Sequence, residues 1–208
     1  MDYDARSQKG ICDMSIVNLV SGGLDSTLIG VMLKEEGLQA FPLFVDYGQL
    51  CAQREWNACL AVHSNFLLPK PERIDLSGYG RLIVSGLTSS AKDVKADAFT
   101  PGRNLLFLLV GAAYAFQVGA KAVAIGLLSE QFSLFPDQRR TFIESAEKTI
   151  QSALSNEIRV TTPLFEFSKV DVLALATQRR ITGTYSCHKG MDKPCGYCIS
   201  CLELAGTN

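Results

Sequence analysis

The sequence predicts an α/β fold, a Rossmann-like open parallel sheet with helices on both faces. Short apolar runs rich in β-branched residues alternate with longer segments of helical period, and this alternation is typical of parallel sheets covered on both sides. The first run enters a glycine-rich turn and a helical segment begins at once, a connection that favours anion binding. The chain has 208 residues, of which 47% are hydrophobic, and this suffices for one domain with its own core.

Five runs are predicted as strands because each is short, apolar and mostly β-branched, and is bounded by turn residues. In chain order they are Ile16–Val20, Ala40–Val45, Arg73–Leu76, Ala122–Gly126 and Ile158–Thr161.

Five longer segments between and after these strands are predicted as helices from the spacing of their apolar residues. Gly37 ends the first helix and Ser168 caps the last. In the second helix, Trp56, Leu60 and Val62 are expected to face the core. Arg54 and Glu55 are expected to face outward. The predicted helices are Ser26–Glu36, Gln49–Asn65, Arg103–Val118, Gln138–Leu154 and Ser168–Gln178.

Residues 77–100 have no strong period and are rich in glycine, serine, lysine and aspartate. We expect a surface excursion there, of the kind that forms mobile lids.

Charge and composition exclude several classes of function. The formal net charge is −1, from 20 Lys and Arg against 21 Asp and Glu, so an extended nucleic-acid surface is not expected. Met1–Asp13 lacks the apolar run of a signal peptide, and the apolar stretch Leu105–Phe116 is too short to span a bilayer. We therefore expect a cytoplasmic protein without a membrane segment. The same apolar stretch would serve either the core or a homodimer interface.

The turn after the first strand reads Ser21-Gly22-Gly23-Leu24-Asp25-Ser26-Thr27. Gly22 and Gly23 permit positive φ and leave room for a ligand, and the amides at the start of the helix favour an anion. The hydroxyls of Ser21, Ser26 and Thr27 are expected to add donors, whereas Asp25 would hold a bridging Mg²⁺ or cap the turn. The Gly-Lys-[Ser/Thr] ending of the Walker loop is absent.

Four of the seven cysteines lie close together near the C-terminus, at Cys187, Cys195, Cys198 and Cys201. Two adjacent C-x2-C steps can direct their sulfurs to one centre, which suits tetrahedral Zn²⁺, although C-x2-C-x2-C also occurs in iron–sulfur proteins. We favour Zn²⁺ and a reduced compartment, with His188 as a bystander. The predicted division is a main domain of residues 1–183 and a zinc-binding appendage of residues 184–208.

Two further segments carry candidate site residues. Asp46-Tyr47-Gly48-Gln49 follows the second strand, at the sheet edge where open α/β folds bind ligands. Arg103 begins an apolar helix after Pro101 and Gly102, an unfavourable place for a cation that indicates a compensating carboxylate or phosphate.

The glycine-rich turn resembles the SGGxDS motif of the PP-loop ATP pyrophosphatases. These enzymes have an adenine nucleotide alpha hydrolase-like fold and cleave ATP between its α and β phosphates. Over residues 15–203 the order and spacing of the motifs resemble the 7-cyano-7-deazaguanine synthase family of queuosine biosynthesis. The matching segments are SGGLDST, DYGQ, PGRNLLFL, Ser133 with Pro136-Asp137 and Arg139, Thr162-Pro163-Leu164 followed by Lys169, and the terminal cysteines.

The resemblance implies an ATP-dependent C–N ligase that adenylates 7-carboxy-7-deazaguanine and, with ammonia, forms the amide and then the nitrile. Its products would be AMP and pyrophosphate, or ADP-level products, and its cofactors ATP, Mg²⁺ and Zn²⁺. The expected catalytic residues are Asp25, Arg103 and Lys169. The nucleotide would be bound by Ser21, Gly22, Gly23, Asp25, Ser26, Thr27, Asp46 and Tyr47. The substrate would be bound by Arg103, Asn104, Gln131, Phe132, Phe135, Asp137 and Arg139.

The segment 131–139 departs from the family pattern Asp-[Phe/Tyr]-Ser-Gly-Tyr-Pro-Asp-Cys-Arg. The family's acid, which suits the adjacent N–H donors of a guanine-like ring, is replaced by Gln131, with Glu130 next to it. Such a change alters substrate choice without affecting ATP chemistry. Two alternative functions therefore stay open. The chain is a relative that transfers the activated acid to another amine, such as a peptide amine, or it is a tRNA sulfur-transfer enzyme with an iron–sulfur cluster.

Overall fold

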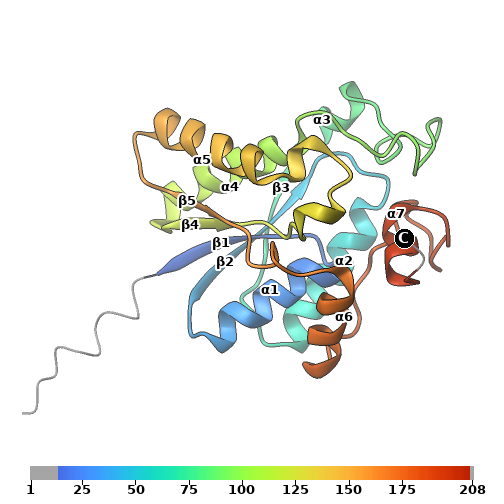
Figure 1. Ribbon diagram of the computed structural model, residues 1–208, viewed down its shortest axis with the longest axis horizontal. Coiled ribbons are helices and arrows are strands. Elements are labelled where there is room, and N and C mark those ends of the chain that lie inside the picture. Colours follow the sequence, from blue (N-terminus) through green and yellow to red (C-terminus); the bar gives the residue numbers. More distant parts are fainter. Residues whose placement is uncertain (1–13, 207–208) are drawn as a thin grey trace, which may run out of the picture.

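A single parallel sheet organises the chain. The computed structural model describes residues 14–206, and within this range five strands pair in the order β3-β2-β1-β4-β5 (Figure 1). All four pairings are parallel, which confirms the predicted open sheet. Residues 1–13, for which the sequence predicts no targeting segment, and residues 207–208 lie outside the described range. The strands are β1 (Ser15–Val20), β2 (Gln39–Asp46), β3 (Glu72–Asp75), β4 (Ala122–Ala124) and β5 (Arg159–Thr161).

Helices cover both faces of this sheet, as the sequence predicts. Helices α1, α2 and α6 lie on one face, and α4 and α5 lie on the other (Figure 1). The α-helices are α1 (Leu24–Glu35), α2 (Ala52–Asn65), α3 (Ser77–Leu82), α4 (Arg103–Val118), α5 (Arg140–Leu154), α6 (Lys169–Gln178) and α7 (Ile199–Leu204). Two 3₁₀ turns, η1 (Glu130–Phe132) and η2 (Pro136–Gln138), precede α5. None of the helices within residues 14–206 is long and apolar enough to cross a membrane.

Two apolar layers hold the helices on the sheet. Leu28 and Ile29 of α1 are fully buried in the layer that α6 completes, and Leu108 of α4 and Ile150 of α5 are buried in the opposite layer. Helix α6 begins with a capping box, because the Ser168 hydroxyl accepts a hydrogen bond from the amide of Asp171. This cap fixes the start of α6, and hence the position of Lys169, at the rim of the sheet.

The strand order places a ligand-binding crevice at the centre of the sheet. From β1 the chain adds β2 and β3 on one side, and it then returns to add β4 and β5 on the other. The loops that leave β1 and β4 therefore run to opposite faces of the sheet. In open α/β sheets, ligands bind at this switch point, outside the carboxyl ends of the strands.

Residues 77–100 lie largely at the surface, as the sequence predicts, and their predicted mobility stays a prediction. Helix α3 forms at their start, and part of the following segment is packed. Leu87, Val94 and Ala98 are each less than 5% exposed, in a small core that they share with Cys187 and Cys198. Because these apolar residues follow no helical or strand period and their partners lie about a hundred residues away, sequence spacing does not reveal this core.

Candidate active site

The turn after β1 is held open by its own hydrogen bonds. Gly22 has a φ of +74°, and α1 begins at Leu24. The Ser21 amide donates to the Ser26 hydroxyl at 3.2 Å, and the Gly23 amide donates to the Ser21 hydroxyl at 3.2 Å. The first amides of a helix have no partners within that helix, so this turn presents donors to an anion.

The close approach of α2 explains why the turn needs a glycine at position 22. A Cβ on Gly22 would lie 2.5 Å from the carbonyl oxygen of Glu55 and 2.6 Å from the amide nitrogen of Cys59. The turn therefore rests directly on the backbone of α2. The hydroxyl of Thr27, which the sequence assigns to the nucleotide, instead donates to the Gly23 carbonyl at 2.7 Å and is buried.

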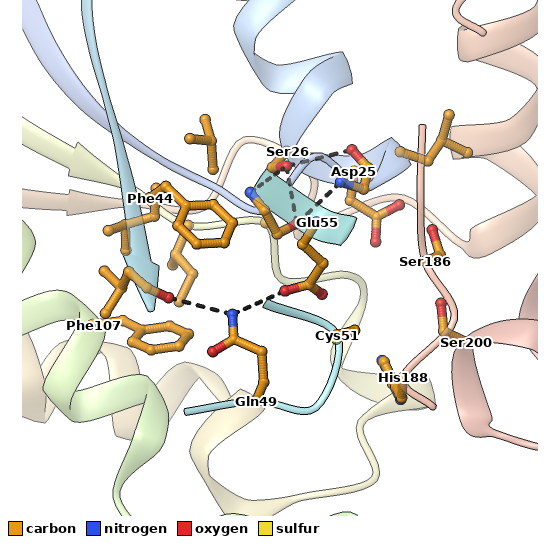
Figure 2. A pocket seen from close by; sticks show the side chains of 18 of the residues that line it. Asp25, Ser26, Phe44, Gln49, Cys51, Glu55, Phe107, Ser186, His188 and Ser200 are labelled. Atoms are coloured by element: carbon orange, nitrogen blue, oxygen red, sulfur yellow. Dashed lines mark hydrogen bonds between the residues drawn. The ribbon is translucent and has the colours of Figure 1, made fainter. Parts of the chain in front are cut away.

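A cavity of about 290 Å³ opens in front of this turn, at the carboxyl ends of the strands. Its walls combine the starts of α1, α2 and α4, the start of α6 and the C-terminal appendage (Figure 2). The structure brings eight of the sequence-predicted site residues to this cavity: Ser21, Gly23, Asp25, Ser26, Tyr47, Arg103, Asn104 and Lys169.

Asp25 and Lys169 form an ion pair on the wall of the cavity. Lys169 Nζ lies 2.7 Å from Asp25 Oδ1, and both side chains are largely buried. Glu203 of α7 lies beside them, and burial raises the pKa of its carboxyl group, while Lys169 opposes the shift and Asp25 adds to it. One cation and two acids thus surround the start of α1, where the phosphates of a nucleotide would lie.

Arg103 also lines the cavity and lies beside two aromatic rings. Its guanidinium carbon is 5.8 Å from the centroid of the Tyr47 ring and 5.9 Å from that of Phe107. Burial raises the pKa of Tyr47 to about 12 even though Arg103 opposes the shift. Arg103 Nε is buried and has no hydrogen-bond partner among residues 14–206. The guanidinium therefore offers an unused donor.

Asn104 and Asp137 join the start of α4 to the 3₁₀ turn η2. Asn104 Nδ2 donates to the backbone oxygen of Asp137 at 3.0 Å. Burial raises the pKa of the Asp137 carboxyl group, with Arg103 opposing the shift. Within the described residues Asp137 Oδ1 is buried without a partner. The side chain of Asp137 thus lies near Arg103 but does not line the cavity.

Asp46 is already paired with the edge of the sheet. Its carboxylate lies 2.6 Å from Arg73 Nη2 and accepts from the Gly48 amide at 3.0 Å. Asp46 does not line the cavity, although Tyr47 next to it does. Its predicted contact with the nucleotide stays a prediction, because the side chain supports the loop after β2 from behind.

The structure does not bring the side chains of loop 131–139 to the cavity. Gln131, Phe132 and Arg139 are exposed, and Phe135 packs against Phe99 with ring centroids 5.3 Å apart. Gln138 fixes the loop in this shape, because its side-chain oxygen accepts from the backbone amides of residues 134 and 135 at 2.8 and 2.9 Å. The nearby Glu130 accepts from an α5 amide at 3.3 Å instead of facing the cavity. The substrate contacts predicted for this loop therefore stay untested.

The four C-terminal cysteines form a candidate metal centre. The sulfurs of Cys187, Cys195, Cys198 and Cys201 all lie within 4.8 Å of one another. The pKa of Cys195 is raised by burial but lowered further by hydrogen bonds from nearby amides, to about 6. A lowered pKa favours the thiolate, which is the form that metals bind. His188 is not part of this group and lines the cavity instead, consistent with its predicted role as a bystander to the metal.

Sequence reasoning missed a set of cavity residues from α2 and the appendage. The prediction that Glu55 faces outward is wrong, because its side chain lines the cavity (Figure 2). The signal was available: Glu55 lies in the first turn of α2, directly after the DYGQ segment at the ligand-binding edge of the sheet. The other polar or ionisable lining residues that sequence reasoning missed are Cys51, Tyr185, Ser186, His188, Ser200 and Glu203.

The fold resembles solved PP-loop-type structures. NMN synthetase from Francisella tularensis matches 95% of this chain and 74% of its own, with a TM-score of 0.54 and 14% identity. The U34-tRNA thiolase NcsA from Methanococcus maripaludis, solved with its [4Fe-4S] cluster, covers 94% of this chain and 65% of its own, with a TM-score of 0.51 and 12% identity. At these identities the two likenesses show the fold alone.

Sequence comparison is more specific. A 7-cyano-7-deazaguanine synthase from Nautilia profundicola is 33% identical over 203 residues, covering 91% of each chain. A second relative of the same name, from Campylobacter concisus, is 32% identical and covers 96% of this chain and 93% of its own. Residues 15–205 match the family model described as queuosine biosynthesis protein QueC. The chain therefore belongs to the family of the queuosine biosynthesis protein QueC.

Proposed function

We propose that this enzyme converts 7-carboxy-7-deazaguanine to 7-cyano-7-deazaguanine with ATP and ammonia. The observation that carries the proposal is the cavity itself, which is lined by both the glycine-rich turn and Arg103. The relatives that match nearly the whole chain are named for this product.

The chemistry requires activation because a carboxylate would have to expel oxide. Transfer of AMP from ATP to the carboxylate oxygen releases pyrophosphate and gives an acyl adenylate, whose leaving group is AMP. Ammonia then attacks the carbonyl carbon, AMP leaves, and loss of one proton gives the amide. A second ATP adenylates the amide oxygen and releases pyrophosphate, and loss of AMP and of both protons from the nitrogen gives the nitrile.

The chain's own residues would serve charge stabilisation and positioning. The amides at the start of α1 and the hydroxyls of Ser21 and Ser26 would bind the phosphates. Lys169, held 2.7 Å from Asp25, would neutralise charge that develops on the departing pyrophosphate. Arg103, which lines the cavity, would attract the anionic substrate into it.

Two metals fit the residues that are present. Asp25 would hold Mg²⁺, because carboxylate oxygen is the ligand type that Mg²⁺ prefers next to phosphates, and the ion would supply charge neutralisation. The four cysteines would hold one Zn²⁺, which would stabilise the appendage. With Zn–S bonds of about 2.3 Å, a tetrahedral ion separates its sulfurs by about 3.8 Å. Sulfurs within 4.8 Å of one another favour this single ion over a four-iron cube, whose corners hold the sulfurs further apart.

A mass-spectrometric assay tests the proposal. Purified protein is incubated with ATP, Mg²⁺, ammonium and 7-carboxy-7-deazaguanine, and we expect the nitrile together with AMP. Omitting ammonium and adding hydroxylamine should trap the acyl adenylate as a hydroxamate. AMP release with an amide that never becomes a nitrile favours the relative with another acceptor amine. If no AMP release depends on the acid, the proposed function is wrong.

A further inference from the structure

Glu55 is an acid that the sequence pattern leaves without a role and that the structure buries in the cavity. It lies in the first turn of α2, and its carboxylate accepts from Gln49 Nε2 at 2.9 Å (Figure 2). The thiol of Cys51 makes a second hydrogen bond to the same carboxylate. Both partners come from the segment that joins β2 to α2, so the orientation of the carboxylate is set locally.

Gln49 is itself held in place, which makes the acceptor rigid. Its side-chain oxygen accepts from the Tyr47 amide at 2.9 Å, and its side-chain nitrogen also lies 3.5 Å from the Val45 oxygen. Gln49 is 6% exposed. The hydrogen bonds of Gln49 are thus satisfied within the protein, and its side chain holds the Glu55 carboxylate in one orientation.

The carboxylate of Glu55 retains acceptor capacity towards the cavity. A carboxylate has about four acceptor positions, and Gln49 and Cys51 occupy only two of them. Burial raises the pKa of the Glu55 carboxyl group, while Gln49, Cys51 and the nearby Arg103 oppose the shift. The cavity is thus lined by an acid, Glu55, and by a nearby guanidinium, Arg103, beside the aromatic rings of Tyr47 and Phe107.

This pattern matches one edge of a deazaguanine ring. That edge carries two adjacent N–H donors, on N1 and on the 2-amino group, next to a carbonyl oxygen. A carboxylate accepts from the two donors, and a guanidinium donates to the carbonyl oxygen. Adenine presents its amino group beside a ring nitrogen with a lone pair, and that lone pair would face the carboxylate unfavourably. Glu55 would therefore distinguish the substrate from the adenine of ATP.

We infer that Glu55, with Arg103 beside it, recognises the guanine-like edge of the substrate. This inference rests on the proposed function and deepens it, since it transfers base recognition from loop 131–139 to the start of α2. It also accounts for the absence of an acid at Gln131, whose side chain is exposed and does not line the cavity.

Binding measurements with Glu55→Gln test the inference. Isothermal titration calorimetry gives the Kd of 7-carboxy-7-deazaguanine, of its analogue without the 2-amino group, and of ATP. We expect Glu55→Gln to weaken binding of the acid about 10- to 100-fold, the usual range for losing a charged hydrogen bond. The Kd of ATP should change less than about twofold, because no recognition of adenine is lost. The matched control is Glu36→Gln, the same change at an exposed acid at the end of α1.

The ratio of two Kd values, that of the 2-deamino analogue and that of 7-carboxy-7-deazaguanine, distinguishes lost recognition from lost folding. Wild-type protein should prefer the acid over its 2-deamino analogue, and Glu55→Gln should reduce that preference about tenfold or more. An unchanged ratio would overturn the inference, as would a variant whose ATP binding weakens as much as its acid binding. If the wild-type protein binds 7-carboxy-7-deazaguanine and either of these results is found, only the inference about Glu55 is refuted. Wild-type protein that binds no acid refutes the proposed function as well.

Discussion

Replacing Gly22 by alanine tests whether the contact between the glycine-rich turn and α2 shapes the site. The φ of +74° costs a non-glycine residue about 1–2 kcal/mol. The added Cβ would also lie 2.5 and 2.6 Å from backbone atoms of α2, which cannot rotate away. Overpacking of this kind costs about 1–3 kcal/mol. We expect Gly22→Ala to lose about 2–5 kcal/mol of unfolding free energy and to weaken ATP binding, because the turn must move.

Gly37→Ala supplies a matched control for the backbone strain. Gly37 has a φ of +71°, and a Cβ there would meet nothing within 4 Å. The difference between the two variants therefore isolates the clash with α2, about 1–3 kcal/mol, or about 2–7 °C in Tm for a chain of this length. Urea unfolding and ATP titration of both variants measure it. The reasoning is refuted if Gly22→Ala has the same unfolding free energy as Gly37→Ala and binds ATP as tightly as the wild type does.

Three further predictions concern the acid Asp25, the cysteine cluster and a buried histidine. Asp25→Asn should reduce AMP release at least tenfold while shifting the unfolding midpoint little, and a variant that melts early but keeps its specific activity would make Asp25 structural. Cys198→Ser should lose bound metal, measured by elemental analysis, and should weaken ATP binding because the appendage lines the cavity; retained metal would contradict the assigned ligands. His63 has a lowered pKa because it is buried, despite its bond to the Pro69 carbonyl, so the unfolded chain binds the extra proton first. As the pH drops below about 6.5, the unfolding free energy of the wild type should therefore fall more steeply than that of His63→Gln, by up to about 1.4 kcal/mol per pH unit. Urea unfolding at several pH values measures both, and a parallel dependence on pH in the two proteins would refute this.

The parts of the site that could be predicted are those that short segments determine. The turn after β1 needs only a strand, two glycines and a helix start, so its position followed from Ser21–Thr27. Lys169 was predictable for a similar reason, since Ser168 caps the helix that begins with it. Both features sit at strand or helix ends that local residue types define.

The rest depends on helix rotation and on contacts between distant segments. On α2 the sequence placed Trp56, Leu60 and Val62 on the inward face; Val62 is fully buried, but the other buried residues of the helix are Cys59 and His63. Glu55 lies one helical turn before Cys59 and shares its face, so an error of one position turned Glu55 outward. The appendage residues were missed because only the folded chain brings residues near position 200 to the start of α1.

The amide of Tyr185 donates to the carbonyl oxygen of Gly22 at 2.9 Å, which ties the last segment of the chain to the first turn of the site. Arg54 of α2 holds the same segment, through the Gly190 carbonyl and Asp192. Consequently a ribosome that has completed the fifth strand has made the whole sheet but not a finished cavity. The cavity is complete only after the segment 185–203 has folded back onto the starts of α1 and α2.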